Sequence, residues 1–158
     1  MKATDLLEKQ HKSVKALFKK VDKTEDGRQR RQLMDQIAHE LKIHTKIEEE
    51  IFYPAVREIG TEKAEEMIDE AFEEHHVVDL VLAELPQVDP EDERFAAKMT
   101  VLSELVEHHA DEEEDEMFPM CEKKLGRDRL EELGERMQQM AEGMGGQRRA
   151  AGCAARRD

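Results

Sequence analysis

Two stretches of the sequence combine a histidine, a glutamate and a proline at the same spacing. The glutamate follows the histidine by four residues, and the proline follows it by ten. The residues are His44, Glu48 and Pro54 in the first stretch and His109, Glu113 and Pro119 in the second. Residues four apart on a helix lie on one face, so each stretch can present an imidazole and a carboxylate to one metal ion, or place them beside two ions. The repeated spacing therefore predicts a metal site.

Further histidines lie roughly one helix upstream of each stretch, at His11 and at the adjacent His75 and His76. The two stretches are offset by 65 residues, and this offset maps His11 onto His76. The apolar spacing favours His75 instead, because Val78 then falls on the core face, whereas His76 would bring Asp79 there. We expect His75 to be the ligand, with His76 as the alternative.

Four segments in which apolar residues recur at helical spacing must position these side chains. We expect helices over about residues 4–21, 28–58, 61–85 and 89–125, separated by turns that contain glycine or proline. Pro54 and Pro119 are expected to kink the last turns of the second and fourth helices. Two similar hairpins predict an all-α fold, an antiparallel up-down four-helix bundle over residues 1–125.

The residues after the predicted bundle divide into two parts. A short extra helix is expected over residues 126–142, with Leu130, Leu133, Met137 and Met140 along one face. Residues 143–158 contain several glycines and arginines, so we expect a flexible tail. This basic tail is a candidate contact for a protein partner.

The overall composition excludes several classes of protein. A chain of 158 residues fits one domain. The formal net charge of −14 argues against binding nucleic acid or an anionic membrane, and no apolar run approaches the roughly 20 residues of a membrane span. The first residues lack an apolar signal core, so we expect a cytoplasmic protein, present as a monomer or weak homodimer.

The metal ligands that we expect are His11, His44, Glu48, His75, His109 and Glu113. Burying so many ionisable groups in a small bundle is unfavourable unless cations compensate them. Four imidazoles and two carboxylates suit two ions a few ångströms apart, with Glu48 and Glu113 bridging them. Open positions then remain for an oxo or hydroxo bridge and for a small exogenous ligand. Mixed nitrogen and oxygen ligation with open positions favours two Fe ions over Mn or Zn.

Three neighbouring residues need separate interpretation. Tyr53 lies five residues after Glu48, about 140° round an ideal helix, which favours the edge of the bundle. A kink at the following proline would instead turn its phenol towards the metals, as a ligand or a hydrogen-bond partner. Asp79 is the weaker candidate as a further ligand. His108 lacks the proline ten residues on, so we expect it outside the ligand set.

With these motifs the sequence resembles the hemerythrin family, in its broader HHE cation-binding branch. The matching residues are His11, His44, Glu48, Phe52, Tyr53, Pro54, Glu74, His75, His109, Glu113, Phe118 and Pro119. The resemblance covers about residues 4–125 and implies a four-helix bundle with a non-haem di-iron centre that handles dioxygen, peroxide or nitric oxide. Oxygen-carrying hemerythrins have a second histidine four residues after the first on the third helix. Here that position is Asp79, which argues against reversible oxygen carriage.

Three functions follow from these observations. The leading one is a di-iron protein that binds and reacts with O2, H2O2 or NO in the bundle core. If it is an enzyme, it is an oxidoreductase that dismutates peroxide in a catalase-like way or turns over nitrogen oxides. The second is a non-catalytic oxygen or iron sensor, or an iron-handling module, because no second domain is recognisable. The third is a helical bundle without metal.

Overall fold

The computed structural model describes the backbone of residues 1–155 and the side chains of residues 1–145, and every regular element in this part of the chain is helical. The four long helices are α1 (Ala3–Lys23), α2 (Gly27–Ile47), α4 (Glu62–Glu84) and α5 (Glu93–Glu112). The shorter segments are η1 (Glu48–Phe52), α3 (Tyr53–Arg57), η2 (Leu85–Gln87), η3 (Glu113–Met117) and α6 (Phe118–Lys124). The last helix is α7 (Arg127–Ala155). None of the described helices is long and apolar enough to cross a membrane.

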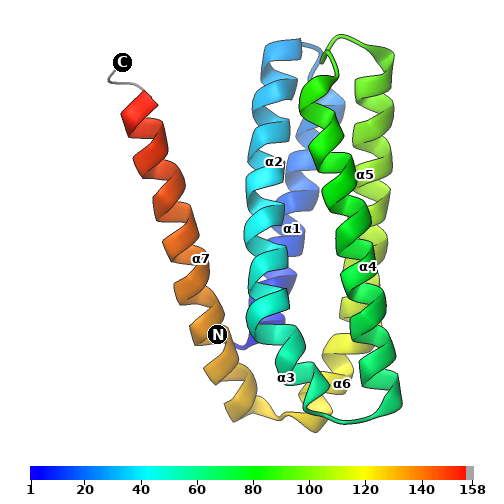
Figure 1. Ribbon diagram of the computed structural model, residues 1–158, viewed down its shortest axis with the longest axis vertical. Helices are drawn as coiled ribbons and strands as arrows, with labels where there is room; N and C mark the ends of the chain where they lie inside the picture. Colours follow the sequence, from blue (N-terminus) through cyan, green and yellow to red (C-terminus); the bar gives the residue numbers. More distant parts are fainter. Residues whose placement is uncertain (156–158) are drawn as a thin grey trace.

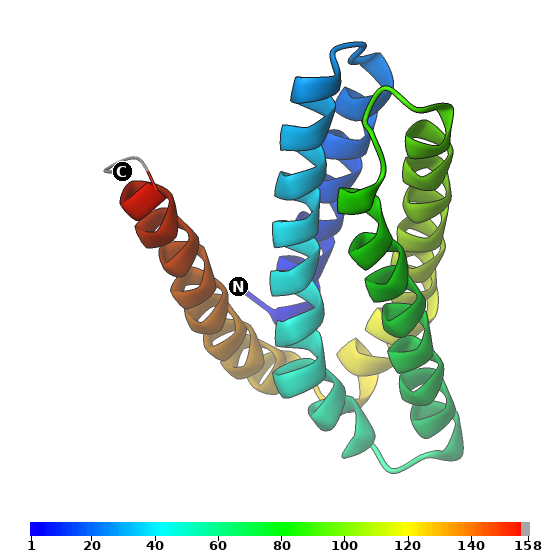
Figure 2. The same ribbon diagram turned by 45° about the horizontal axis from the view of Figure 1, so that its top comes forward.

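The long helices form the predicted four-helix bundle (Figure 1). α1 and α2 make one antiparallel hairpin, α4 and α5 make the other, and the two hairpins pack side by side. Figure 2 shows the same arrangement from a second direction, with the first part of α7 against the α1–α2 hairpin and its later part leading away from the bundle. Short connections between successive helices account for the alternating direction.

Side-chain caps fix where three of the long helices begin. Asp26 accepts a hydrogen bond from the N–H of Arg28, Thr61 from that of Ala64, and Asp92 from that of Arg94. The fourth long helix therefore begins at Glu93, a few residues later than expected. Two aspartates near this point, Asp89 and Asp92, could cap the helix. Asp92 does so, whereas Asp89 accepts a hydrogen bond from the N–H of Glu91 at 2.9 Å and closes a turn.

α2 and α5 each continue through one wide turn, η1 and η3. Backbone hydrogen bonds in these turns join residues five apart, because the N–H of Tyr53 donates to the carbonyl of Glu48 and that of Phe118 to the carbonyl of Glu113. Each turn is followed by a proline, whose ring would clash with the carbonyl four residues earlier in a regular α-helix. The kinks expected at the prolines thus take the form of π-helical turns.

Two apolar layers fill the bundle. One includes Leu7, Ile47, Phe52 and Phe118 near the α3 and α6 end, and the other includes Phe18, Ile37, Phe95 and Leu102 near the opposite end. Between them lie four buried histidines and two buried glutamates. The hydrophobic layers fix the long helices, and the helices in turn hold the polar layer in place.

α7 covers one side of the bundle. Its Leu130, Leu133 and Met137 are fully buried against the first apolar layer. The helix continues to Ala155, so the helix expected over 126–142 is too short. Glycines make a helix less stable by about 1 kcal/mol each but need not end it. The flexibility expected for the tail stays a prediction, and residues 156–158 lie outside the described residues.

Candidate metal centre

Each long helix contributes one histidine to a buried polar layer in the middle of the bundle. The layer consists of His11 of α1, His44 of α2, Glu48 of η1, His75 of α4, His109 of α5 and Glu113 of η3. All six side chains are less than a tenth exposed. These are the six residues expected from the sequence. The structure brings them together, while their binding of metal stays a prediction.

The layer divides into two groups of three, each with possible ligand atoms within 4.8 Å of one another. The groups are His11, His44 and Glu113, and Glu48, His75 and His109. Oε1 of Glu113 lies 3.1 Å from Nε2 of His11 and 3.4 Å from Nε2 of His109. Oε1 of Glu48 lies 2.7 Å from Nε2 of His44 and 3.4 Å from Nε2 of His75. Each carboxylate thus contacts both groups, as a bridging ligand would.

All four histidines turn Nε2 inward and hold Nδ1 against an oxygen at the outside of the layer. The Nδ1 partners are Glu114 for His11 (3.2 Å), Gln10 for His44 (2.7 Å), Glu49 for His75 (2.9 Å) and Glu74 for His109 (2.9 Å). An acceptor at Nδ1 favours the tautomer with its hydrogen there, which leaves the Nε2 lone pair available to a metal.

Three of these outer partners, Gln10, Glu49 and Glu114, are not among the residues that the sequence singles out. A signal exists nevertheless. Gln10 and Glu74 directly precede the histidines of α1 and α4, and Glu49 and Glu114 directly follow the carboxylates of the two repeated stretches. Positions that flank the ligands equally in both repeats are therefore candidates to orient them.

One close contact inside the layer is not a hydrogen bond. Nε2 of His44 and Oε1 of Glu48 lie 2.7 Å apart, yet neither atom has a hydrogen-bond partner among the described residues. Buried polar atoms are nearly always paired. Two electron-pair donors that face each other without a hydrogen bond suit a shared cation. With four imidazoles and two carboxylates, the donor set fits two cations whose charge would compensate the buried carboxylates.

Tyr53 lies inside the layer, so the expectation that it lies at the bundle edge is wrong. Its side chain is fully buried, and its hydroxyl lies 3.0 Å from Oε2 of Glu48 and of Glu113. The same hydroxyl is 3.2 Å from Nε2 of His75 and of His109. The expectation fails because the π-turn takes five residues to close, which brings Tyr53 into line with Glu48.

Three polar residues near the expected ligands in the sequence lie outside the layer. His76 and Asp79 are exposed on α4, so they do not reach the buried histidines. His108 is 65 % exposed and lies 2.9 Å from the carboxylate of Glu112. The histidine choices made from apolar spacing, His75 and His109, are the two that point into the bundle.

Electrostatic interactions in the layer shift several pKa values. Burial lowers the pKa of His109, but the carboxylates of Glu113 and Glu74 outweigh burial and raise it to about 10. Burial and then the charge of Glu48 raise the pKa of Glu113 to about 7. Burial acts to raise the pKa of Glu48 as well, but His44 and the other polar neighbours hold it well below its usual value. Without metal, bound protons therefore balance the negative charge of the buried carboxylates, which cations would balance in the loaded protein.

A small apolar cavity lies against the four histidines on the side of the second apolar layer. Its remaining walls include one aliphatic side chain from each long helix, one turn from that helix's histidine: Val14, Leu41, Val78 and Val106. The cavity measures about 20 Å³, which is room for one water-sized molecule. The cavity therefore offers room for a small ligand beside the histidines.

The model of the Hemerythrin HHE cation binding domain family matches residues 2–121. The chain belongs to this family. The match contains all six residues of the buried layer and Tyr53, so the HHE domain and the candidate metal centre coincide. Cation binding, with iron as the typical metal, is the property that the family brings to this centre.

Relatives of this HHE domain occur in bacteria and in yeast. An uncharacterized protein of Mycobacterium tuberculosis is 32% identical over 139 residues, which are 87% of this chain and 83% of that protein. An uncharacterized hemerythrin-like protein of Schizosaccharomyces pombe is 25% identical over 122 residues, 77% of this chain and 60% of that protein. The family resemblance noted in the sequence is thereby confirmed.

A crystal structure supports the fold. An HHE cation binding domain-containing protein from Mycobacterium kansasii superposes with a TM-score of 0.81 at 31% sequence identity, covering 93% of this chain and 89% of that one. The similarity extends beyond the bundle, because 93% of the chain is more than residues 2–121. The helical bundle expected from the sequence is therefore confirmed by two comparisons.

Proposed function

We propose that this HHE domain holds two iron ions and reacts with a small oxidant or nitrogen oxide, with hydrogen peroxide as the first candidate. The observation that carries the proposal is the inward orientation of four Nε2 atoms around two carboxylates that each contact both groups. His11, His44 and Glu113 would hold one ion, and Glu48, His75 and His109 the other. Such a pair of ions supplies two-electron redox capacity and open coordination positions.

The size and polarity of the small cavity support a diatomic or peroxide ligand. Its aliphatic walls exclude bulk water and leave about 20 Å³ beside the histidines. Interactions between charges are stronger where water is excluded. The limited room therefore favours O2, H2O2 and NO as a class.

The balance of the peroxide reaction defines what the protein residues must do. One peroxide molecule loses two electrons and two protons to become O2, and a second takes up two electrons and two protons to become two water molecules. Protons must therefore be held near the centre between the two halves. The Tyr53 hydroxyl is placed for this, because it lies 3.0 Å from a carboxylate oxygen of both Glu48 and Glu113.

Burial and the two carboxylates raise the pKa of Tyr53 well above its usual value. The phenol therefore keeps its proton near neutral pH and acts as a hydrogen-bond donor. It can donate to whichever carboxylate carries more negative charge. This arrangement supports Tyr53 as the group that positions a proton at the centre.

The proposal is tested on protein loaded with ferrous iron under anaerobic conditions. We expect near-ultraviolet absorption to change on addition of peroxide, azide or NO, and O2 to be released from peroxide. His109→Ala is expected to lower peroxide consumption at least about tenfold, whereas His76→Ala, at an exposed position of α4, keeps it within about twofold. If the loaded protein neither changes its spectrum nor consumes any of the three molecules, the redox proposal is wrong. Consumption of NO but not peroxide would assign the nitrogen-oxide reaction.

A further inference from the structure

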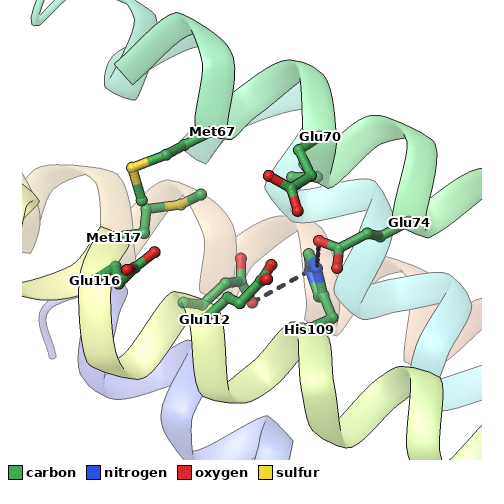
Figure 3. A pocket seen from close by; sticks show the side chains of 9 residues that line it. Met67, Glu70, Glu74, His109, Glu112, Glu116 and Met117 are labelled. Atoms are coloured by element: carbon green, nitrogen blue, oxygen red, sulfur yellow. Dashed lines mark hydrogen bonds and ion pairs between the residues drawn. The ribbon is translucent and has the colours of Figure 1, made fainter. Parts of the chain in front are cut away.

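A pocket between α4 and the α5–η3 segment opens beside the metal centre (Figure 3). Four glutamates surround it, Glu70, Glu74, Glu112 and Glu116, and its floor includes His109 and Glu113. We call these six residues the acidic pocket. Figure 3 shows the carboxylates of Glu70, Glu74 and Glu112 turned towards the same hollow above the imidazole of His109. The hollow measures about 30 Å³.

The carboxylates of the acidic pocket form a continuous series from solvent to the centre. Glu70 and Glu116 are exposed, Glu74 and Glu112 are partly buried, and Glu113 is buried. Glu74 lies 2.9 Å from Nδ1 of His109 and so joins the pocket directly to a residue of the centre. A charge run on a solvated helix face would not end on a fully buried carboxylate in this way.

Donor atoms at the mouth of the pocket are close enough to hold a cation temporarily. Glu74, His108 and Glu112 place one possible ligand atom each within 4.8 Å of one another. Each of these side chains keeps some exposure to solvent. A strongly negative hollow attracts cations and raises their local concentration. The next ligands inward from this trio are His109 and Glu113.

The same position in the first repeat is closed by hydrocarbon. The counterparts of Glu70, Glu74, Glu112 and Glu116 are Leu6, Gln10, Ile47 and Ile51, at offsets of 64 residues for α1 and 65 for the second stretch. The three aliphatic counterparts are buried. They pack in the same apolar cluster as Leu130, Leu133 and Met137 of α7. The two halves of the bundle therefore carry the same centre but differ in access to it.

We propose that the acidic pocket is the route by which divalent cations enter the metal centre from solvent, while α7 closes the equivalent position on the α1–α2 side. This inference rests on the metal binding in the proposed function. It adds the side of the bundle from which the cations enter and the residues that they pass. Exposed glutamates attract the ion, the trio at the mouth replaces part of its hydration, and His109 and Glu113 receive it. Glu74 has a second role, because it also orients His109.

The test measures how fast metal-free protein takes up ferrous iron, with no enzymatic assay involved. The variant Glu70→Gln/Glu112→Gln/Glu116→Gln removes three charges of the acidic pocket and keeps side-chain size and Glu74. The control Glu65→Gln/Glu104→Gln/Glu107→Gln removes three charges from exposed positions of α4 and α5 that do not line the pocket. Free iron is followed with a chromophoric chelator after mixing at low ionic strength, and bound iron is counted at the end.

We expect uptake by the pocket variant to be about five- to tenfold slower than by the wild type, with the control within about twofold and the same final iron content in all three. Added salt is expected to reduce the difference in uptake rate between the wild type and the pocket variant, because it screens the attraction between the glutamates and the iron ion. Equal rates for the pocket and control variants at full iron content would overturn this inference alone. A lower final content in the pocket variant only would also overturn it, since those glutamates would then belong to the centre itself. Absence of iron in every form would overturn the proposed function as well.

Discussion

Residues that differ between the two repeats make the centre asymmetric. Tyr53 and Phe118 are equivalent at the 65-residue offset, and both follow a π-turn. The Tyr53 hydroxyl lies 3.2 Å from the Nε2 atoms of His75 and His109. Phe118 instead stacks on His11, with 6.0 Å between ring centroids. Two ions in this centre would therefore have different neighbours, one beside a phenol and the other near a hydrocarbon ring.

Replacing Tyr53 by phenylalanine separates hydrogen bonding from metal ligation. We expect Tyr53→Phe to keep two metal ions and to destabilise the metal-free protein by about 1–2 kcal/mol, because buried carboxylate oxygens lose a donor. Urea denaturation and elemental analysis measure the two effects. A fall to one ion per chain would show that the phenol is a ligand instead. Since the chain has one tyrosine and no tryptophan, quenching of wild-type tyrosine fluorescence on iron loading reports the same site.

Metal affinity is expected to rise with pH. In the metal-free centre His109, with a pKa of about 10, is protonated at pH 7, and Glu113, with a pKa of about 7, is partly protonated. A cation must displace these protons, so affinity falls as the pH falls below these pKa values. Calorimetry with Mn²⁺ at pH 6, 7 and 8, in two buffers of different ionisation enthalpy, is expected to show at least about one proton released per chain. Binding that is independent of pH and releases no proton would contradict the protonation pattern.

The sequence is most informative about the helices. Apolar spacing and the residues at the helix ends predict the four long helices, and the two repeated stretches predict which helix faces meet. The position of Tyr53 does not follow from spacing, because an ideal α-helix turns by a fixed angle per residue and the π-turn interrupts it. The proline ten residues after each histidine indicates that the regular α-helix is interrupted near that proline. It does not reveal whether the helix bends or takes in an extra residue.

α7 offers a matched pair of glycine substitutions. Gly134 lies where α7 meets the start of α1, and a Cβ there would clash with the carbonyl of Met1 and the backbone that follows. Gly143 has no atom within 4 Å of the corresponding position. We expect Gly134→Ala to destabilise the protein by about 1–3 kcal/mol through overpacking and Gly143→Ala to be neutral or to stabilise it by up to about 1 kcal/mol. Urea denaturation compares them, and equal midpoints would mean that α7 does not pack on α1 in this way.

At the scale of the whole molecule, the polar layer separates two hydrophobic layers that would otherwise be continuous. The repeat in the sequence predicts this layer, because the ligands recur at fixed positions in two hairpins. The acidic pocket is harder to predict. In the sequence its glutamates resemble ordinary solvated helix residues. Only the packing of α7 on the α1–α2 hairpin shows that this side of the centre is closed, whereas the α4–α5 side is open.

Metal binding is expected to stabilise the bundle as a whole. Cations that bind the folded centre more tightly than the unfolded chain shift the unfolding equilibrium, by about 2.7 kcal/mol at a free concentration one hundred times Kd. Thermal unfolding of the loaded protein is therefore expected at a higher temperature than after removal of metal by a chelator. His109→Ala is expected to lose this difference, and His76→Ala, at an exposed position of α4, to keep it. An unchanged unfolding temperature in the wild type after complete metal removal would contradict this coupling.

The most direct test of the central claim is the metal content of natively purified protein, compared with two variants at adjacent positions. The side chain of His75 points into the buried layer, whereas that of His76 lies on the surface of the same helix. We expect about two iron ions per chain in the wild type and in His76→Ala, and a clear loss in His75→Ala. Well under one metal ion per chain in the wild type, or equal content in the two variants, would contradict the account of a dinuclear metal centre held by the four helices.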